Sequence, residues 1–163
     1  MPNKISSEIS LLLDMLDQAY DKRAWHGTNL LGSLRGLKPD MLLWRPGPKR
    51  HNIWEIALHA AYWKYAVYRR ITQADKGSFP RNPSDWPTLP VKTDNKTWQA
   101  DLSLLKKYHK QLREAIHNLP AAKLNKKMPE SKMLYKQVIY GIASHDLYHA
   151  GQIQLLKRLY KNR

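Results

Sequence analysis

Residues 134–160 read LYKQVIYGIASHDLYHAGQIQLLKRLY, and apolar side chains recur in this stretch at steps of three and four residues. Such steps place side chains on one face of an α-helix. The members of this stripe are Leu134, Val138, Ile142, His145, His149, Ile153 and Leu156. The stretch therefore predicts a long helix whose inward face carries two histidines at positions where core residues belong.

Three further helical regions precede this stretch. The first spans about residues 5–37, with a break expected near His26 and Gly27. The second starts after Asn52, a good N-cap with Glu55 three residues further on as in a capping box, and runs to about residue 73. The third covers about residues 96–118, and its apolar side chains also follow a helical spacing.

Proline decides how the second and third helices are connected. Residues 74–96 contain four prolines, too closely spaced for a helix to persist between them: Pro80, Pro83, Pro87 and Pro90. An extended connector of this length is long enough to return to the starting end of the second helix, so the second and third helices can be parallel. With only seven glycines and no alternating strand pattern, the chain is expected to be an all-α four-helix bundle with this long Pro-rich crossover between helices 2 and 3.

Composition narrows the class of protein. A chain of 163 residues is suited to one hydrophobic core, so we expect a single domain over residues 1–163. We expect a soluble protein with a cytoplasmic location, because the start of the chain has no signal-peptide pattern and no apolar run is long enough to cross a membrane. The absence of cysteine excludes disulfides, thiolate metal ligands and a cysteine nucleophile.

The charge is strongly positive. Lys and Arg number 28 against 13 Asp and Glu, and the formal net charge is +15. Such a balance attracts nucleic acids and other anions, and the sequence keeps open a nucleic-acid-binding function in which aromatic residues among the lysines take part. These are Trp98, Tyr108, Tyr135 and Tyr140. Because no recognisable nucleic-acid-binding module is present, such binding is expected to be non-specific and sensitive to salt.

The two histidines of the final stretch suggest a metal site. Imidazoles four residues apart on a helix can converge on one ion, whereas two separate buried histidines would each lose hydration. A third ligand must lie upstream, because no Asp, Glu or His follows His149. His59 and His109 both lie on or beside inward helix faces, and the spacing alone does not choose between them. The remaining histidines sit next to expected breaks or helix ends, where exposed or capping roles are usual: His26, His51 and His117.

The order His145-Asp146-Leu147-Tyr148-His149 differs from the zincin protease motif. That motif has Glu where Asp146 stands, and it often has a third ligand downstream. Both departures argue against a metalloprotease.

Three segments resemble the DinB-like family of metal-binding four-helix bundles. They are Ala24–Gly27 (AWHG), Ile53–His59 (IWEIALH) and His145–Ile153 (HDLYHAGQI), and together they extend over most of the chain. The resemblance implies that His59, rather than His109, joins His145 and His149 around one divalent ion. It also implies an up-down-down-up helix order and a homodimer.

The resemblance further suggests what such an ion would do. Characterised relatives include transferases that use low-molecular-weight thiols such as bacillithiol or mycothiol. We therefore expect Zn, Ni, Mn or Fe to activate a thiol or water for attack on a small-molecule substrate, in an S-transferase or hydrolase reaction. Candidate proton carriers are Glu55, Asp146 and His26, and Tyr62 and Trp63 are expected to line the substrate pocket. The alternative for this site is a metal that only stabilises the bundle.

Overall fold

The computed structural model describes residues 5–163, and every regular element within that range is helical. The prediction of an all-α protein is confirmed for this part of the chain. In chain order the α-helices are α1 (Ser7–Tyr20), α2 (Leu30–Ser33), α3 (Pro39–Leu43), α4 (Ile53–Thr72), α5 (Asn95–His117) and α6 (Tyr135–Lys161), and a 3₁₀ turn covers Ala121–Lys123.

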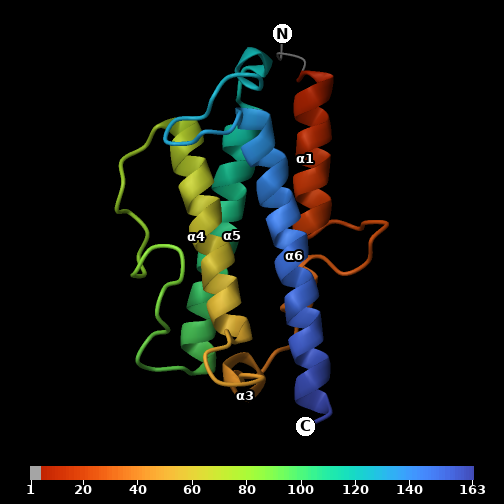
Figure 1. The fold of residues 1–163 in the computed structure, drawn as a ribbon, viewed down its shortest axis with the longest axis vertical. Coiled ribbons are helices and arrows are strands. Elements are labelled where there is room, and N and C mark those ends of the chain that lie inside the picture. The colour runs from red at the N-terminus through yellow and green to blue at the C-terminus, as the bar shows by residue number, and fades with distance from the viewer. Residues whose placement is uncertain (1–4) are drawn as a thin grey trace.

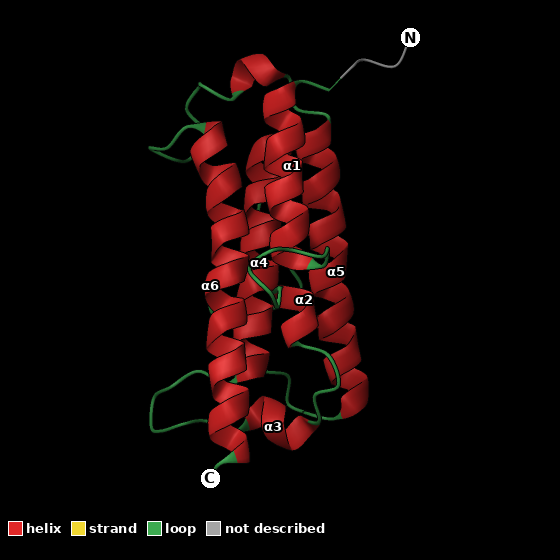
Figure 2. Ribbon diagram, turned by 90° about the vertical axis from the view of Figure 1, so that its right-hand side faces the viewer, coloured by secondary structure: helices red, strands yellow, loops and turns green. Residues whose placement is uncertain are grey.

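Four of the helices are long and lie side by side along the long axis of the molecule (Figures 1 and 2). The colours of Figure 1 show that α4 and α5 run in the same direction, and that α1 and α6 run in the opposite direction. The segment between α4 and α5 passes along the outside of these two helices, back to the end where α4 began (Figure 1). None of the helices described over residues 5–163 is both long and apolar enough to span a membrane.

The start of α4 follows the sequence prediction. The side chain of Asn52 accepts a hydrogen bond from the Glu55 backbone N–H at 2.9 Å, and the Glu55 carboxylate accepts one from the Asn52 N–H at 3.0 Å. This capping box satisfies two backbone donors that a helix start leaves free. The predicted second, third and fourth helices agree with α4, α5 and α6 to within one residue or so at each end.

In the first helical region the predicted break near His26 and Gly27 is confirmed, but the helices on either side of it are shorter than predicted. Helix α1 ends at Tyr20, residues 21–29 are not helical, and α2 is a single turn. Gly27 and Gly36 adopt φ angles of +98° and +67°, a left-handed conformation that interrupts a right-handed helix. The Asn29 side chain accepts a hydrogen bond from the Gly32 N–H at 2.9 Å and so starts α2 as a new helix.

The buried face of α6 differs from the predicted stripe. Asp146 is fully buried and His149 is 3% exposed, whereas His145 is only partly buried. Two apolar clusters fill the bundle, and along α4 and α6 Lys64 and Asp146 lie where one cluster gives way to the other. A layer of polar side chains therefore crosses the middle of the core, next to the histidines of α6.

The structure also bears on the aromatic residues among the lysines. Trp98, Tyr108 and Tyr135 are buried in the core, and only Tyr140 is exposed. Stacking on nucleic acid bases requires an accessible ring. Three of the four aromatic residues considered for nucleic-acid binding therefore pack in the core and are not accessible to bases.

Candidate metal centre

Three imidazoles from two helices meet beside the polar layer. His59 is on α4, and His145 and His149 are on α6. Their ligand nitrogens lie within 4.8 Å of one another. Within residues 5–163, these three side chains are therefore close enough together to hold one metal ion. The Nε2 atom of His145 is 3.0 Å from Nε2 of His59 and 3.0 Å from Nε2 of His149. The three nitrogens thus face a common point.

The other ring nitrogens fix the protonation of two of these histidines. Nδ1 of His59 lies 2.7 Å from the backbone oxygen of Asp85, and this carbonyl can only accept a hydrogen bond. Nδ1 of His149 lies 2.7 Å from the side-chain oxygen of Gln152, which also accepts. Both Nδ1 atoms therefore carry the hydrogen, and Nε2 of His59 and of His149 presents a lone pair.

Hydrogen bonds among the three imidazoles cannot satisfy all three Nε2 atoms. His145 Nε2 has at most one hydrogen to donate, yet it faces two lone pairs at the same distance of 3.0 Å. A cation between the three nitrogens would use every lone pair. Two nitrogens 3.0 Å apart can both lie at the roughly 2.0–2.1 Å that metal–imidazole bonds require. The donor set therefore fits a divalent transition metal.

Burial keeps these imidazoles neutral. It lowers the pKa of His145 to about 3 and that of His149 to about 4, and it lowers the pKa of His59 as well. The neighbouring imidazoles add to the lowering at His145 and His149. Only a neutral imidazole can bind a metal, so the three nitrogens are available as ligands at neutral pH.

The connector between α4 and α5 contributes directly to this site. The ring of Trp86 stacks on the ring of His59, with centroids 3.9 Å apart. It also stacks on the ring of His51, with centroids 3.6 Å apart. Asp85 holds His59 through its backbone oxygen and accepts a hydrogen bond from the Trp63 indole at 2.7 Å. Sequence reasoning missed Asp85 and Trp86, although a tryptophan within a polar, Pro-rich connector was a signal for a buried contact.

The predicted pocket-lining residues lie close to His59 in different ways. Trp63 contacts the His59 ring edge-on, with centroids 6.4 Å apart. Tyr62 turns toward Phe79 of the connector at 5.5 Å and lines a separate cavity. A role in binding substrate stays a prediction for both.

The three candidate proton carriers have different surroundings. Glu55 caps α4, and both of its oxygens accept hydrogen bonds from Arg45 at 2.6 and 2.7 Å. Asp146 is fully buried and accepts a hydrogen bond from Lys64 at 2.6 Å. His26 is exposed in the segment between α1 and α2. Their catalytic role stays a prediction.

His109, the alternative third ligand, lies apart from the group of three nitrogens. Its ring stacks on Tyr20 of α1, with centroids 3.5 Å apart, and its Nδ1 atom is buried without a hydrogen-bond partner. Burial lowers the pKa of His109 to about 2, and the nearby positive charges of Lys64 and Arg113 act in the same direction. His109 is therefore a neutral core side chain.

This environment predicts acid sensitivity that His109→Phe will relieve. The unfolded chain takes up a proton at His109 below about pH 6.5, whereas the folded protein does not do so until about pH 2. Stability is therefore lost as the pH falls below 6.5, by about 1.4 kcal/mol per pH unit. Between pH 7 and 5 the wild type should lose about 2 kcal/mol more than His109→Phe.

Urea unfolding of both proteins in the presence of a chelator measures this difference. Phenylalanine keeps a ring against Tyr20 and removes the titrating group. Equal losses of stability in the two proteins would contradict the assignment of a neutral, buried His109.

One comparison with known proteins identifies a family for this chain. The sequence profile described as the DinB superfamily matches residues 22–153, which include all three converging histidines. A comparison with curated proteins found no match to this chain.

Proposed function

Because the chain belongs to the DinB superfamily, a superfamily of metal-binding proteins, we propose that His59, His145 and His149 hold one divalent transition-metal ion and that the protein is a metal-dependent enzyme. The observation that carries this proposal is the convergence of three Nε2 atoms, two of them with lone pairs fixed by their partners. Zn, Ni, Mn and Fe are the ions to be tested.

The number of ligands supports catalysis over a structural role. Structural zinc sites are usually closed by four protein ligands, whereas catalytic sites keep a position for water or substrate. Three neutral imidazoles would leave the full charge of the ion in place, and one of them, His145, is partly exposed. A bound divalent ion would supply Lewis acidity, which lowers the pKa of a coordinated water or thiol.

The proposed reaction is the attack of a thiol or of water on a small electrophile, as in an S-transferase or a hydrolase. A low-molecular-weight thiol is the proposed cosubstrate. The residues of the chain orient the ligands: Asp85 and Gln152 each accept the Nδ1 hydrogen of one ligand histidine, and Trp86 packs against the ring of His59. Glu55, Asp146 and His26 remain the proposed proton carriers, and His26 is the one whose side chain is exposed.

The proposal extends to the architecture. We propose an up-down-down-up four-helix bundle over residues 1–163, with the Pro-rich crossover between its second and third long helices, that acts as a cytoplasmic homodimer. The common direction of α4 and α5 in Figure 1 supports this helix order.

Metal reloading tests the function. Protein stripped with a chelator is reloaded separately with Zn, Ni, Mn or Fe and assayed for thiol transfer and for hydrolysis of small electrophiles. We expect turnover that depends on one of these ions and is lost in His149→Ala. Absence of metal-dependent turnover, combined with a higher melting temperature on metal addition, would show that the ion is structural and would overturn the enzymatic proposal.

A further inference from the structure

A second candidate site lies further along α4. A partly open cavity of about 240 Å³ lies between the C-terminal half of α4, the connector that follows it and Glu130. It begins at Tyr62, three residues from His59, and reaches Arg70, eleven residues from His59. At 1.5 Å per residue, Arg70 lies about 16 Å from His59 along the helix.

One wall of this cavity is aromatic. Tyr62 and Tyr65 of α4 each pack against Phe79 of the connector, with ring centroids 5.5 Å apart in both pairs. Tyr65 and Phe79 are themselves buried by this packing, and Tyr62 is the half-buried ring that a ligand can contact. Its ring would make favourable contacts with a flat, apolar group.

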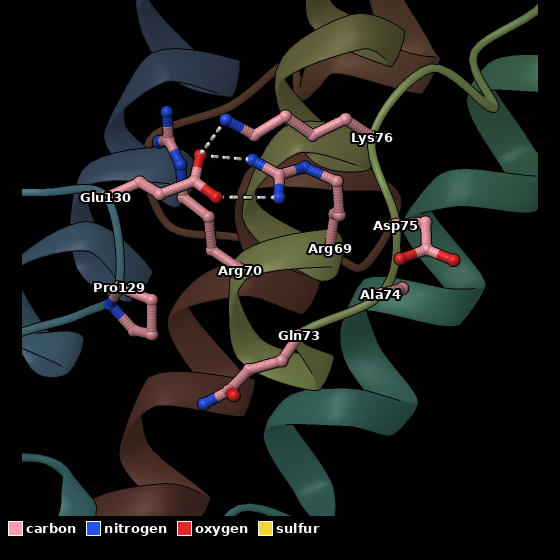
Figure 3. Close-up of a pocket in the computed structure, with 8 residues that line it drawn as sticks. All are labelled: Arg69, Arg70, Gln73, Ala74, Asp75, Lys76, Pro129 and Glu130. Carbon is pink, nitrogen blue, oxygen red and sulfur yellow. Dashed lines mark hydrogen bonds and ion pairs between the residues drawn. The ribbon is translucent and has the colours of Figure 1, made fainter.

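The rest of the lining is strongly cationic. Four positively charged side chains line the cavity: Arg69, Arg70, Lys76 and Arg81. Arg69 donates two hydrogen bonds to Glu130, at 3.0 and 2.7 Å, and Lys76 lies 3.2 Å from the same carboxylate (Figure 3). Arg81 pairs with Asp101 at 2.7 Å. Four cations are thus matched by only two carboxylates.

Arg70 is the cation without a carboxylate. Among residues 5–163 it forms no ion pair, and its Nε atom is buried without a hydrogen-bond partner. Its guanidinium carbon lies 5.8 Å from the centroid of the Trp63 ring. Arg70 is half-buried and its buried Nε donor has no acceptor, so an anion that reaches this guanidinium would be favoured at this position.

The surroundings of Arg70 already accommodate one anion. Together with Arg69, Lys76 and Glu130, Arg70 also lines an adjoining cavity of about 300 Å³ (Figure 3). The hydrogen bond from Arg69 and the neighbouring Lys76 hold the pKa of Glu130 down to about 2. Gln73 in this lining ends α4 in a left-handed conformation, with a φ angle of +56°, and Glu130 has the same φ angle.

We propose that this cavity binds a small aromatic anion, a ring that carries a phosphate or carboxylate, with the ring against the half-buried Tyr62 and the anionic group on Arg70. Binding of this anion requires none of the three histidines, so this inference is independent of the metal site. The further idea that the bound molecule is a substrate, and extends toward His59, rests on the proposed function.

Calorimetric titration of chelator-treated protein tests the proposal with four probes. Phenyl phosphate and benzoate carry both the ring and the anion, whereas phenol lacks the anion and inorganic phosphate lacks the ring. We expect phenyl phosphate, benzoate or both to bind. Phenol and inorganic phosphate should each bind more weakly than the aromatic anion that binds. Arg70→Gln should weaken the binding of the aromatic anion by about 10–100-fold.

Arg158→Gln is the matched control, because Arg158 is exposed on α6 and its loss changes the net charge equally. Tyr62→Leu provides a second variant that should weaken phenyl phosphate more than inorganic phosphate. The proposal is overturned if neither aromatic anion binds, or if phenol binds as tightly as the aromatic anion does. It is also overturned if Arg158→Gln weakens binding as much as Arg70→Gln. His149→Ala should bind the aromatic anion like the wild type, so a failure of the metal site would be seen separately.

Discussion

Replacing His149 by alanine will remove the divalent metal from the protein, whereas replacing His109 by alanine will leave it bound. His149 contributes one of three converging nitrogens, and His109 stacks on Tyr20 away from them. Loss of a hydrogen-bond partner behind a ligand typically costs 10–100-fold in metal affinity. Loss of the ligand itself should therefore exceed roughly 100-fold.

The measurement is metal content by mass spectrometry on tag-free protein, after reloading and removal of unbound ions. Wild type and His109→Ala should carry about one ion per chain, as expected for a single site. His59→Ala and His145→Ala should behave like His149→Ala, since each removes one nitrogen of the same group. Retention of a full ion by His149→Ala, or its loss from a folded His109→Ala, would contradict the assignment of the ligands.

Either Lys64→Met or Asp146→Leu alone will destabilise the protein strongly, and the two changes together will restore most of the stability. Lys64 and Asp146 are 2.6 Å apart, and both side chains are fully buried. Removal of one partner leaves an uncompensated buried charge, which costs about 3–5 kcal/mol. Two apolar side chains of similar volume are often neutral or stabilising at such a position.

Urea unfolding of the wild type, both single variants and the double variant measures the coupling. A chelator is needed throughout, because Asp146 is next to His145 and metal binding would otherwise contribute. Each single variant should also lower the melting temperature by roughly 6–20 °C. Lys92→Met is the matched control: its ion pair with Asp94 is exposed, so it should change stability by less than about 1 kcal/mol. A double variant as unstable as the sum of the singles would contradict the coupling.

Local sequence signals were sufficient for the long helices. The N-cap Asn52 and Glu55 define the start of α4, and the spacing of apolar residues defines α6. These signals concern neighbouring residues, whose geometry in a helix is regular. The same approach located the break near Gly27 but overextended the helices on either side of it, because the end of α1 at Tyr20 and the left-handed Gly36 after α2 depend on chain turns rather than on apolar spacing.

Contacts between residues that are far apart in the sequence could not be predicted from these local signals. His59 and His109 both occupy inward helix positions, and only the three-dimensional arrangement shows that His109 meets Tyr20. The pairing of Lys64 with Asp146 joins residues 82 positions apart. Trp86 lies in a segment without periodicity, so no pattern predicted that it would stack on His59.

The sequence separation of the converging histidines has a thermodynamic consequence. His59 and His145 are 86 residues apart, so an ion held by both would close a large loop of the chain, much as a disulfide does. Because the unfolded chain would release the ion, the gain in stability would depend on the concentration of free metal, and would be about 2.7 kcal/mol when that concentration is 100 times the Kd. The supply of metal would then set how strongly the folded protein resists unfolding, in addition to filling the site.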